Sequence, residues 1–201
     1  MNSGSEDAGY PGRTRLWRAI EVFALTALLA LAIAETATSQ GGILKPQIDE
    51  RTAFTVIGIE VRTNNSEAAT VISRQWDRFF KEGLLGKIPN RADANILAVY
   101  TNYASDHRGD YDYLIGARVQ DGSKAPEGMA AKTIPKSRYA VLTTGQGPVG
   151  KVVSEAWREI WSLEDTGGLG GKRAYKADFE VYDQRSRDPD NSQVDIYVGI
   201  E

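Results

Sequence analysis

The chain has 201 residues, of which 41% are hydrophobic and 25% are charged, enough to bury the core of one domain of ordinary size. Its formal net charge is −3 and its pI is about 5.4, so the composition gives no sign of a surface that binds nucleic acid. It contains no cysteine and a single histidine, His107, which excludes disulfides and thiolate sites and leaves little basis for a zinc site or for histidine catalysis. The sequence therefore predicts no metal and no cofactor.

The first 44 residues differ in composition from the rest of the chain. Three arginines precede an apolar run from Val22 to Ala34, and small residues follow that run. This order is typical of a secretory signal peptide, and the run is shorter than the 20 or so residues that a membrane span needs. We expect residues 1–44 either to export the protein or to tether it to a membrane through residues 16–34. The alternative is a cytoplasmic protein.

The first half of the remaining chain is predicted to contain three strands and one helix. Residues 54–61 alternate like a strand, and Asn65 or Ser66 can cap a helix that runs to about residue 82. Apolar side chains recur along that helix at helical spacing. The other two strands of this half are predicted at residues 96–100 and 111–116.

The second half is predicted to follow the same order. A strand at residues 138–142 leads to Gly147 and Pro148, and a proline at this point is typical of the start of a helix. A glycine-rich loop follows this helix. The last two strands are predicted at residues 179–182 and 194–199.

The two halves align as an internal repeat. Trp76 and Phe80 of the first helix correspond to Trp157 and Trp161 of the second, and Ala98-Val99-Tyr100 corresponds to Glu180-Val181-Tyr182. The offset stays between 81 and 83 residues throughout. This pattern predicts an α+β fold built as a tandem β-α-β-β repeat, with a pseudo-two-fold axis and a central ligand cleft.

Alternation in the last strand predicts which side chains face the cleft. Aliphatic side chains alternate there with Asp195, Tyr197 and Gly199. We expect the aliphatic face to pack against the helices and the other face to line a cleft between the halves, whose sides the second helix would close. The alternative for Glu180 is an ordinary solvated strand face. The predicted ligand-binding residues are Tyr100, Leu114, Trp157, Trp161, Glu180, Tyr182 and Tyr197.

The composition of this cleft predicts the charge of its ligand. Aromatic faces attract cations by roughly 0.5 to 2 kcal/mol each. A carboxylate such as Glu180 adds a charge-assisted contact. The predicted cleft therefore suits a small organic cation.

Residues 45–201 resemble the GyrI-like small-molecule-binding domain, the effector-binding domain that also follows AraC-type and MerR-type DNA-binding domains. The most specific matches are Asp178-Phe179-Glu180-Val181-Tyr182 and Ile196-Tyr197-Val198-Gly199-Ile200. The resemblance is closest to the stand-alone, integron-associated effector-binding proteins. It implies two SHS2-like half-domains, with Glu180 as the partner of cationic, lipophilic drugs or dyes and Tyr197 as a pocket tyrosine. No DNA-binding module fits in residues 1–44, so no nucleic acid is expected as a partner in cis.

The sequence leaves three function classes open. The first is a stand-alone module that binds cationic amphipathic or aromatic compounds. The second, implied by the resemblance, is a hydrolase of reactive electrophilic small molecules in which Glu180 acts as a general base. The third is a protein-interaction role like that of the gyrase inhibitors, with a protein partner that the sequence does not identify.

Overall fold

The computed structural model describes residues 45–201. The predicted signal peptide or membrane tether falls on residues 1–44 and lies outside the described residues. Within residues 45–201, no helix combines the length and the apolar character that crossing a membrane requires.

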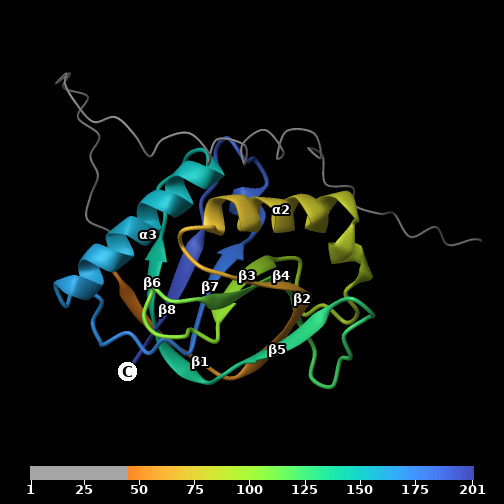
Figure 1. Ribbon diagram of the computed structural model, residues 1–201, viewed down its shortest axis with the longest axis horizontal. Coiled ribbons are helices and arrows are strands. Elements are labelled where there is room, and N and C mark those ends of the chain that lie inside the picture. The colour runs from red at the N-terminus through yellow and green to blue at the C-terminus, as the bar shows by residue number, and fades with distance from the viewer. Residues whose placement is uncertain (1–44) are drawn as a thin grey trace, which may run out of the picture.

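The described residues form a sheet with two α-helices packed on it (Figure 1). The predicted helices and strands are present, with ends that differ by a few residues. Two strands, β1 and β5, were not predicted, because each has five residues and only one large aliphatic side chain. In chain order the elements are β1 (Gln47–Arg51), β2 (Phe54–Thr63), α2 (Ala68–Lys81), the 3-10 helix η2 (Leu84–Lys87), β3 (Ile96–Thr101), β4 (Tyr111–Val119), β5 (Ala130–Ile134), β6 (Ser137–Thr143), α3 (Val149–Asp165), β7 (Ala177–Tyr182), the 3-10 helix η3 (Gln184–Ser186) and β8 (Asp195–Ile200).

The strands within residues 45–201 form one eight-stranded sheet in the order β1-β6-β8-β7-β3-β4-β2-β5, with antiparallel pairing throughout. Each half contributes its first, third and second strands from the outside inward, and the inner strands β7 and β3 pair. The edge strands are exchanged: β1 precedes the first half but pairs with β6, and β5 precedes the second half but pairs with β2. The predicted α+β fold with two related halves is confirmed.

The pseudo-two-fold axis passes through the middle of the sheet. Ala98 on β3 lies directly opposite Glu180 on β7. These two residues are also equivalent in the repeat, so the axis that relates the halves runs between them. A single carboxylate therefore lies at the centre of symmetry, with an alanine as its counterpart.

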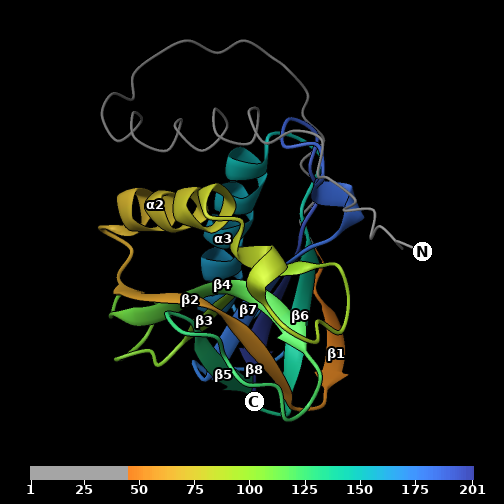
Figure 2. The ribbon, with the colours of Figure 1, turned by 90° about the vertical axis from the view of Figure 1, so that its right-hand side faces the viewer.

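Both helices lie on the same side of the curved sheet (Figure 2). Helix α2 packs on the strands of the first half and α3 on those of the second. Glu180 pairs with Ile196, whose side chain packs beneath α3, so Glu180 also points to the helical side. The prediction that the cleft opens on the face away from the helices is wrong. Each helix covers the strands of its own half, so the central strands between the helices remain uncovered and form the floor of a pocket on the helical side.

The opposite face of the sheet curls around a second core. Phe54 on β2 and Phe179 on β7 have ring centroids 5.4 Å apart, although two strands lie between β2 and β7. Neighbouring strands are about 4.8 Å apart, so this contact requires strong curvature. Gly58 and Gly116 pair directly on β2 and β4, and a Cβ on Gly58 would lie only 2.0 Å from the backbone oxygen of Ile115. The curl depends on this close approach.

Candidate functional site

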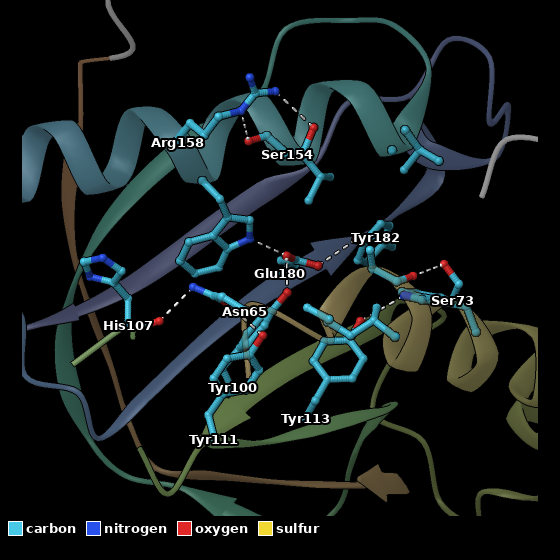
Figure 3. A pocket seen from close by; sticks show the side chains of 18 of the residues that line it. Asn65, Ser73, Tyr100, His107, Tyr111, Tyr113, Ser154, Arg158, Glu180 and Tyr182 are labelled. Carbon is cyan, nitrogen blue, oxygen red and sulfur yellow. Dashed lines mark hydrogen bonds between the residues drawn. The ribbon is translucent and has the colours of Figure 1, made fainter. Parts of the chain in front are cut away.

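A pocket of about 380 Å³ lies between the two helices, over the central strands of the sheet (Figure 3). Apolar side chains of the two helices form its walls, and aromatic side chains of the strands surround one carboxylate on its floor. The walls include Ile72, Trp76 and Phe80 from α2 and Val153, Trp157 and Trp161 from α3. The floor includes Ile96, Tyr100, Tyr111, Tyr113, Glu180 and Tyr182.

Glu180 is the buried charge of this pocket, with 1% of its surface exposed. The indole Nε1 of Trp157 donates to Oε1 of Glu180 at 2.6 Å, and the hydroxyl of Tyr100 donates to the same oxygen at 2.8 Å. The hydroxyl of Tyr182 donates to Oε2 at 2.6 Å (Figure 3). Among residues 45–201, no lysine, arginine or histidine forms an ion pair with Glu180. In the described part of the chain, the carboxylate thus has three donors and no countercharge.

Burial and hydrogen bonding shift the pKa of Glu180 in opposite directions. Burial raises the pKa of Glu180, while the hydrogen bonds from Trp157, Tyr182 and Tyr100 act to lower it. Burial, and then the charge of Glu180, raises the pKa of Tyr100 and Tyr182, so both hydroxyls stay protonated and donate. Two oxygens that accept three hydrogen bonds are what an ionised carboxylate provides. Burying an ionised carboxylate without a countercharge is unfavourable.

The aromatic rings of the pocket touch one another across the repeat. Trp76 of the first half lies against Tyr182 of the second, with ring centroids 4.9 Å apart and planes at 68°. Trp157 of the second half lies against Tyr100 of the first, at 5.1 Å and 64°. The two contacts are equivalent in the repeat and nearly identical in geometry.

The indole N–H groups of the two tryptophans have different partners. Trp76 donates to the hydroxyl of Tyr113 at 2.9 Å, whereas Trp157 donates to Glu180. The position equivalent to Tyr113 in the second half is Ile196, which has no acceptor. Glu180, in place of Ala98, supplies one.

A polar network closes the end of the pocket next to α3. The guanidinium of Arg173, whose side chain is 1% exposed, forms a short ion pair with the buried Asp178 and a second one with Glu164 at 3.3 Å. Arg173 also lies 4.3 Å from the ring of Tyr175. The hydroxyl of Tyr175 donates to Glu164 at 2.6 Å. The backbone of Tyr175 has a φ of 50°, which is strained for a residue of this size. These contacts join the segment before β7 to the end of α3 and to β7 itself.

The loop between β3 and β4 reaches the same end. His107 stacks on Trp161 with ring centroids 5.3 Å apart, and its Nδ1 is 3.7 Å from Glu164. Asn65, predicted as a helix cap, instead donates its side-chain amide to the carbonyl of His107 at 2.7 Å. Helix α2 begins at Ala68 without a side-chain cap.

Most of the predicted site residues line the pocket, and two do not. The five that line it are Tyr100, Trp157, Trp161, Glu180 and Tyr182. Leu114 and Tyr197 lie in the core on the opposite face of the sheet, where Tyr197 stacks on Phe179 at 4.5 Å. Their predicted placement is wrong because Tyr197 pairs with Phe179, one residue before Glu180, so its side chain points away from the helices.

Sequence reasoning missed several lining residues that the repeat could have found. Trp76 and Phe80 are equivalent to the predicted Trp157 and Trp161 and line the opposite wall. Tyr111 and Tyr113 lie on the face of β4 opposite to the predicted Leu114, so the correct choice of face would have predicted them. Arg173 and His107 come from loops, where no alternation indicates direction.

The described residues offer no metal centre. Within residues 45–201, no group of three or more histidine, aspartate or glutamate side chains is placed to hold a metal ion. The pocket's one fully buried carboxylate is held by aromatic donors.

Residues 47–200 match the family model of the integron-associated effector binding protein. The chain belongs to this family of effector-binding proteins. The putative transcriptional regulator protein YobU of Bacillus subtilis is 32% identical over 148 residues, which cover 72% of this chain and 90% of YobU. The transcriptional regulator BrlR of Pseudomonas aeruginosa is 36% identical over 160 residues, which cover 77% of this chain and 54% of BrlR. The chain thus spans about half the length of BrlR.

Solved structures share the fold of this effector-binding chain. An integron cassette protein of Vibrio cholerae is 25% identical with a TM-score of 0.57, over 78% of this chain and 96% of that one. SAV2435, solved bound to tetraphenylphosphonium, is 20% identical with a TM-score of 0.67, over 79% of this chain and 94% of SAV2435.

Proposed function

We propose that this effector-binding protein captures organic monocations with aromatic substituents, and that Glu180 pairs with their charge. The observation that carries the proposal is the buried carboxylate on the pocket floor, which has three hydrogen-bond donors and, among residues 45–201, no cationic partner. A ligand cation would neutralise it. The related fold of SAV2435 accommodates tetraphenylphosphonium, a cation of this class, which supports the proposal.

The walls of the pocket favour the same ligand class. Tryptophan, tyrosine and phenylalanine side chains present ring faces that attract cations and pack against aromatic substituents. Small inorganic cations would leave these apolar walls without contact. A hydrophobic cation satisfies both the charge of Glu180 and the walls.

The test compares two ions of nearly the same shape and opposite charge, tetraphenylphosphonium and tetraphenylborate, by calorimetric titration. The wild-type protein should bind the phosphonium ion and discriminate against the borate ion. Glu180→Gln should weaken phosphonium binding by about 10- to 100-fold, since hydrogen bonds and contacts to charged groups contribute roughly 1.5 to 3 kcal/mol.

Geometry makes Glu180→Gln a conservative change. The amide oxygen can accept from Trp157 and Tyr100, and the amide nitrogen can donate to the hydroxyl of Tyr182, which then rotates its own proton away. Glu60→Gln is the matched control, because Glu60 pairs with Lys132 away from the pocket. Equal binding of the two ions by the wild-type protein would contradict the proposal.

A further inference from the structure

We infer that the pocket is a pair of aromatic half-sites that share one carboxylate, and that its ligands are cations whose charged centre bears two aromatic arms. This inference rests on the proposed function and narrows its ligand class. It comes from the position of Glu180 on the pseudo-two-fold axis, where the two halves of the repeat form matching tryptophan–tyrosine contacts.

The first half-site is formed by Trp76, Phe80 and Tyr182. Trp76 stacks on Phe80 with ring centroids 5.6 Å apart and planes at 22°, and it meets Tyr182 edge-on at 4.9 Å. All three line the pocket, and Phe80 and Tyr182 are only partly buried. An aromatic group placed here would meet ring surface on more than one side.

The second half-site is formed by Trp157, Trp161 and Tyr100. Trp157 meets Tyr100 at 5.1 Å in the same edge-on manner. Trp161 occupies the position equivalent to Phe80, and its ring is stacked on His107. An aromatic group here would also meet aromatic side chains, although Arg173 lies over the ring of Trp157 at 5.8 Å on this side of the pocket.

The carboxylate of Glu180 joins the half-sites through its two oxygens. Oε2 accepts from Tyr182 of the first half-site, and Oε1 accepts from Tyr100 and Trp157 of the second. Figure 3 shows Tyr182 and Tyr100 approaching the carboxylate from different sides. A ligand charge facing this carboxylate lies between the half-sites, so substituents on opposite sides of the charge can each enter one of them.

Three quaternary ammonium ions test this arrangement on the unmodified protein by calorimetric titration. Benzyltrimethylammonium has one aromatic arm, dibenzyldimethylammonium has two, and biphenylylmethyl-trimethylammonium carries two rings in a single arm. The two-armed ion should bind about tenfold or more tighter than the one-armed ion, since a buried ring contact is worth about a factor of ten. The biphenyl ion should bind less tightly than the two-armed ion.

Two equivalent substitutions test whether both half-sites are used. Phe80→Leu and Trp161→Leu each alter one half-site at a partly buried position, and neither residue hydrogen-bonds to Glu180. Each should weaken the two-armed ion several-fold. The one-armed ion should lose at most about twofold in either variant, because it can use the other half-site, and should weaken clearly only in the double variant.

The outcomes separate this inference from the proposed function. Equal binding of the three ions, tighter binding of the biphenyl ion than of the two-armed ion, or sensitivity of the two-armed ion to only one substitution would overturn the two-armed ligand class and leave cation binding in place. Failure of every cation to bind would overturn both.

Discussion

Glu180 combines features that seldom occur together in one residue. It is fully buried, it accepts hydrogen bonds from two tyrosines and a tryptophan, and it has no cationic partner among residues 45–201. A buried carboxylate without a countercharge is normally avoided. The three donors keep it tolerable in the empty pocket, and a cationic ligand would remove the remaining penalty.

Cation binding should depend on pH through Glu180. Burial raises the pKa of Glu180 in the empty protein above its ordinary value of 4.5. A bound cation favours the ionised form, so affinity should rise with pH through this pKa, level off above it, and fall by up to about tenfold per pH unit below it. Titrations of tetraphenylphosphonium from about pH 8 to about pH 5 measure this, and Glu180→Gln should show a flat profile. A pH dependence that persists in Glu180→Gln would contradict the assignment to Glu180.

The stability of the ligand-free protein should change with pH in the direction opposite to cation affinity. Between the ordinary pKa of a glutamate and the raised pKa of Glu180, the folded state binds more protons than the unfolded state. Unfolding free energy contributed by Glu180 therefore decreases as pH rises through this window, and the full penalty of the buried charge is present above it.

Among the elements, β7 carries two buried carboxylates with different roles. Asp178 and Glu180 are both on the helical side, but Asp178 is paired with the buried Arg173 and also accepts from the hydroxyl of Tyr103 at 2.6 Å and the backbone N–H of Gly199 at 2.8 Å. Asp178 thus joins β7 to β8, to the β3–β4 loop and to the segment before β7. Its role is structural.

Asp178→Asn should therefore destabilise the fold, unlike Glu180→Gln. The change leaves the buried Arg173 with only the more distant Glu164 as a countercharge. Breaking a buried ion pair costs about 3 to 5 kcal/mol, which lowers Tm by roughly 10 °C for a domain of this size. Thermal unfolding measures it, with Asp49→Asn as a control whose exposed pair with Arg51 should contribute less than about 1 kcal/mol. Similar Tm values for the two variants would contradict the structural role of Asp178.

How far the sequence predicts these elements depends on the kind of signal each one carries. The repeat was readable because Trp76 and Trp157 keep their spacing, and alternation located the inner strands. Alternation correctly predicts that the aliphatic face of β8 packs beneath α3, but it does not give the register between strands, so it does not show that Tyr197 lies on the face opposite to Glu180. The edge strand β1 carries too little apolar surface to be predicted, and loop residues such as Arg173 are positioned only by tertiary contacts.

In the whole molecule, the site combines the symmetry of the repeat with a departure from it at Glu180. Exchange of β1 and β5 between the halves locks them into one sheet, and each helix covers its own half. The helix walls of the pocket are thus lined by equivalent residues, Trp76 and Phe80 on one side and Trp157 and Trp161 on the other. The pair of Ala98 and Glu180 on the axis departs from this equivalence by adding one negative charge.

The position of a bound cation shows directly whether Glu180 faces the charge of the ligand. Tetraphenylarsonium matches the phosphonium ion in shape, and the anomalous X-ray scattering of its arsenic marks the charged centre in a crystal of the complex. We expect one arsenic peak in the pocket, between the half-sites and facing the carboxylate of Glu180, with the surrounding ring centroids within about 6 Å. A peak outside the pocket, or one buried in a single half-site away from Glu180, would contradict this expectation.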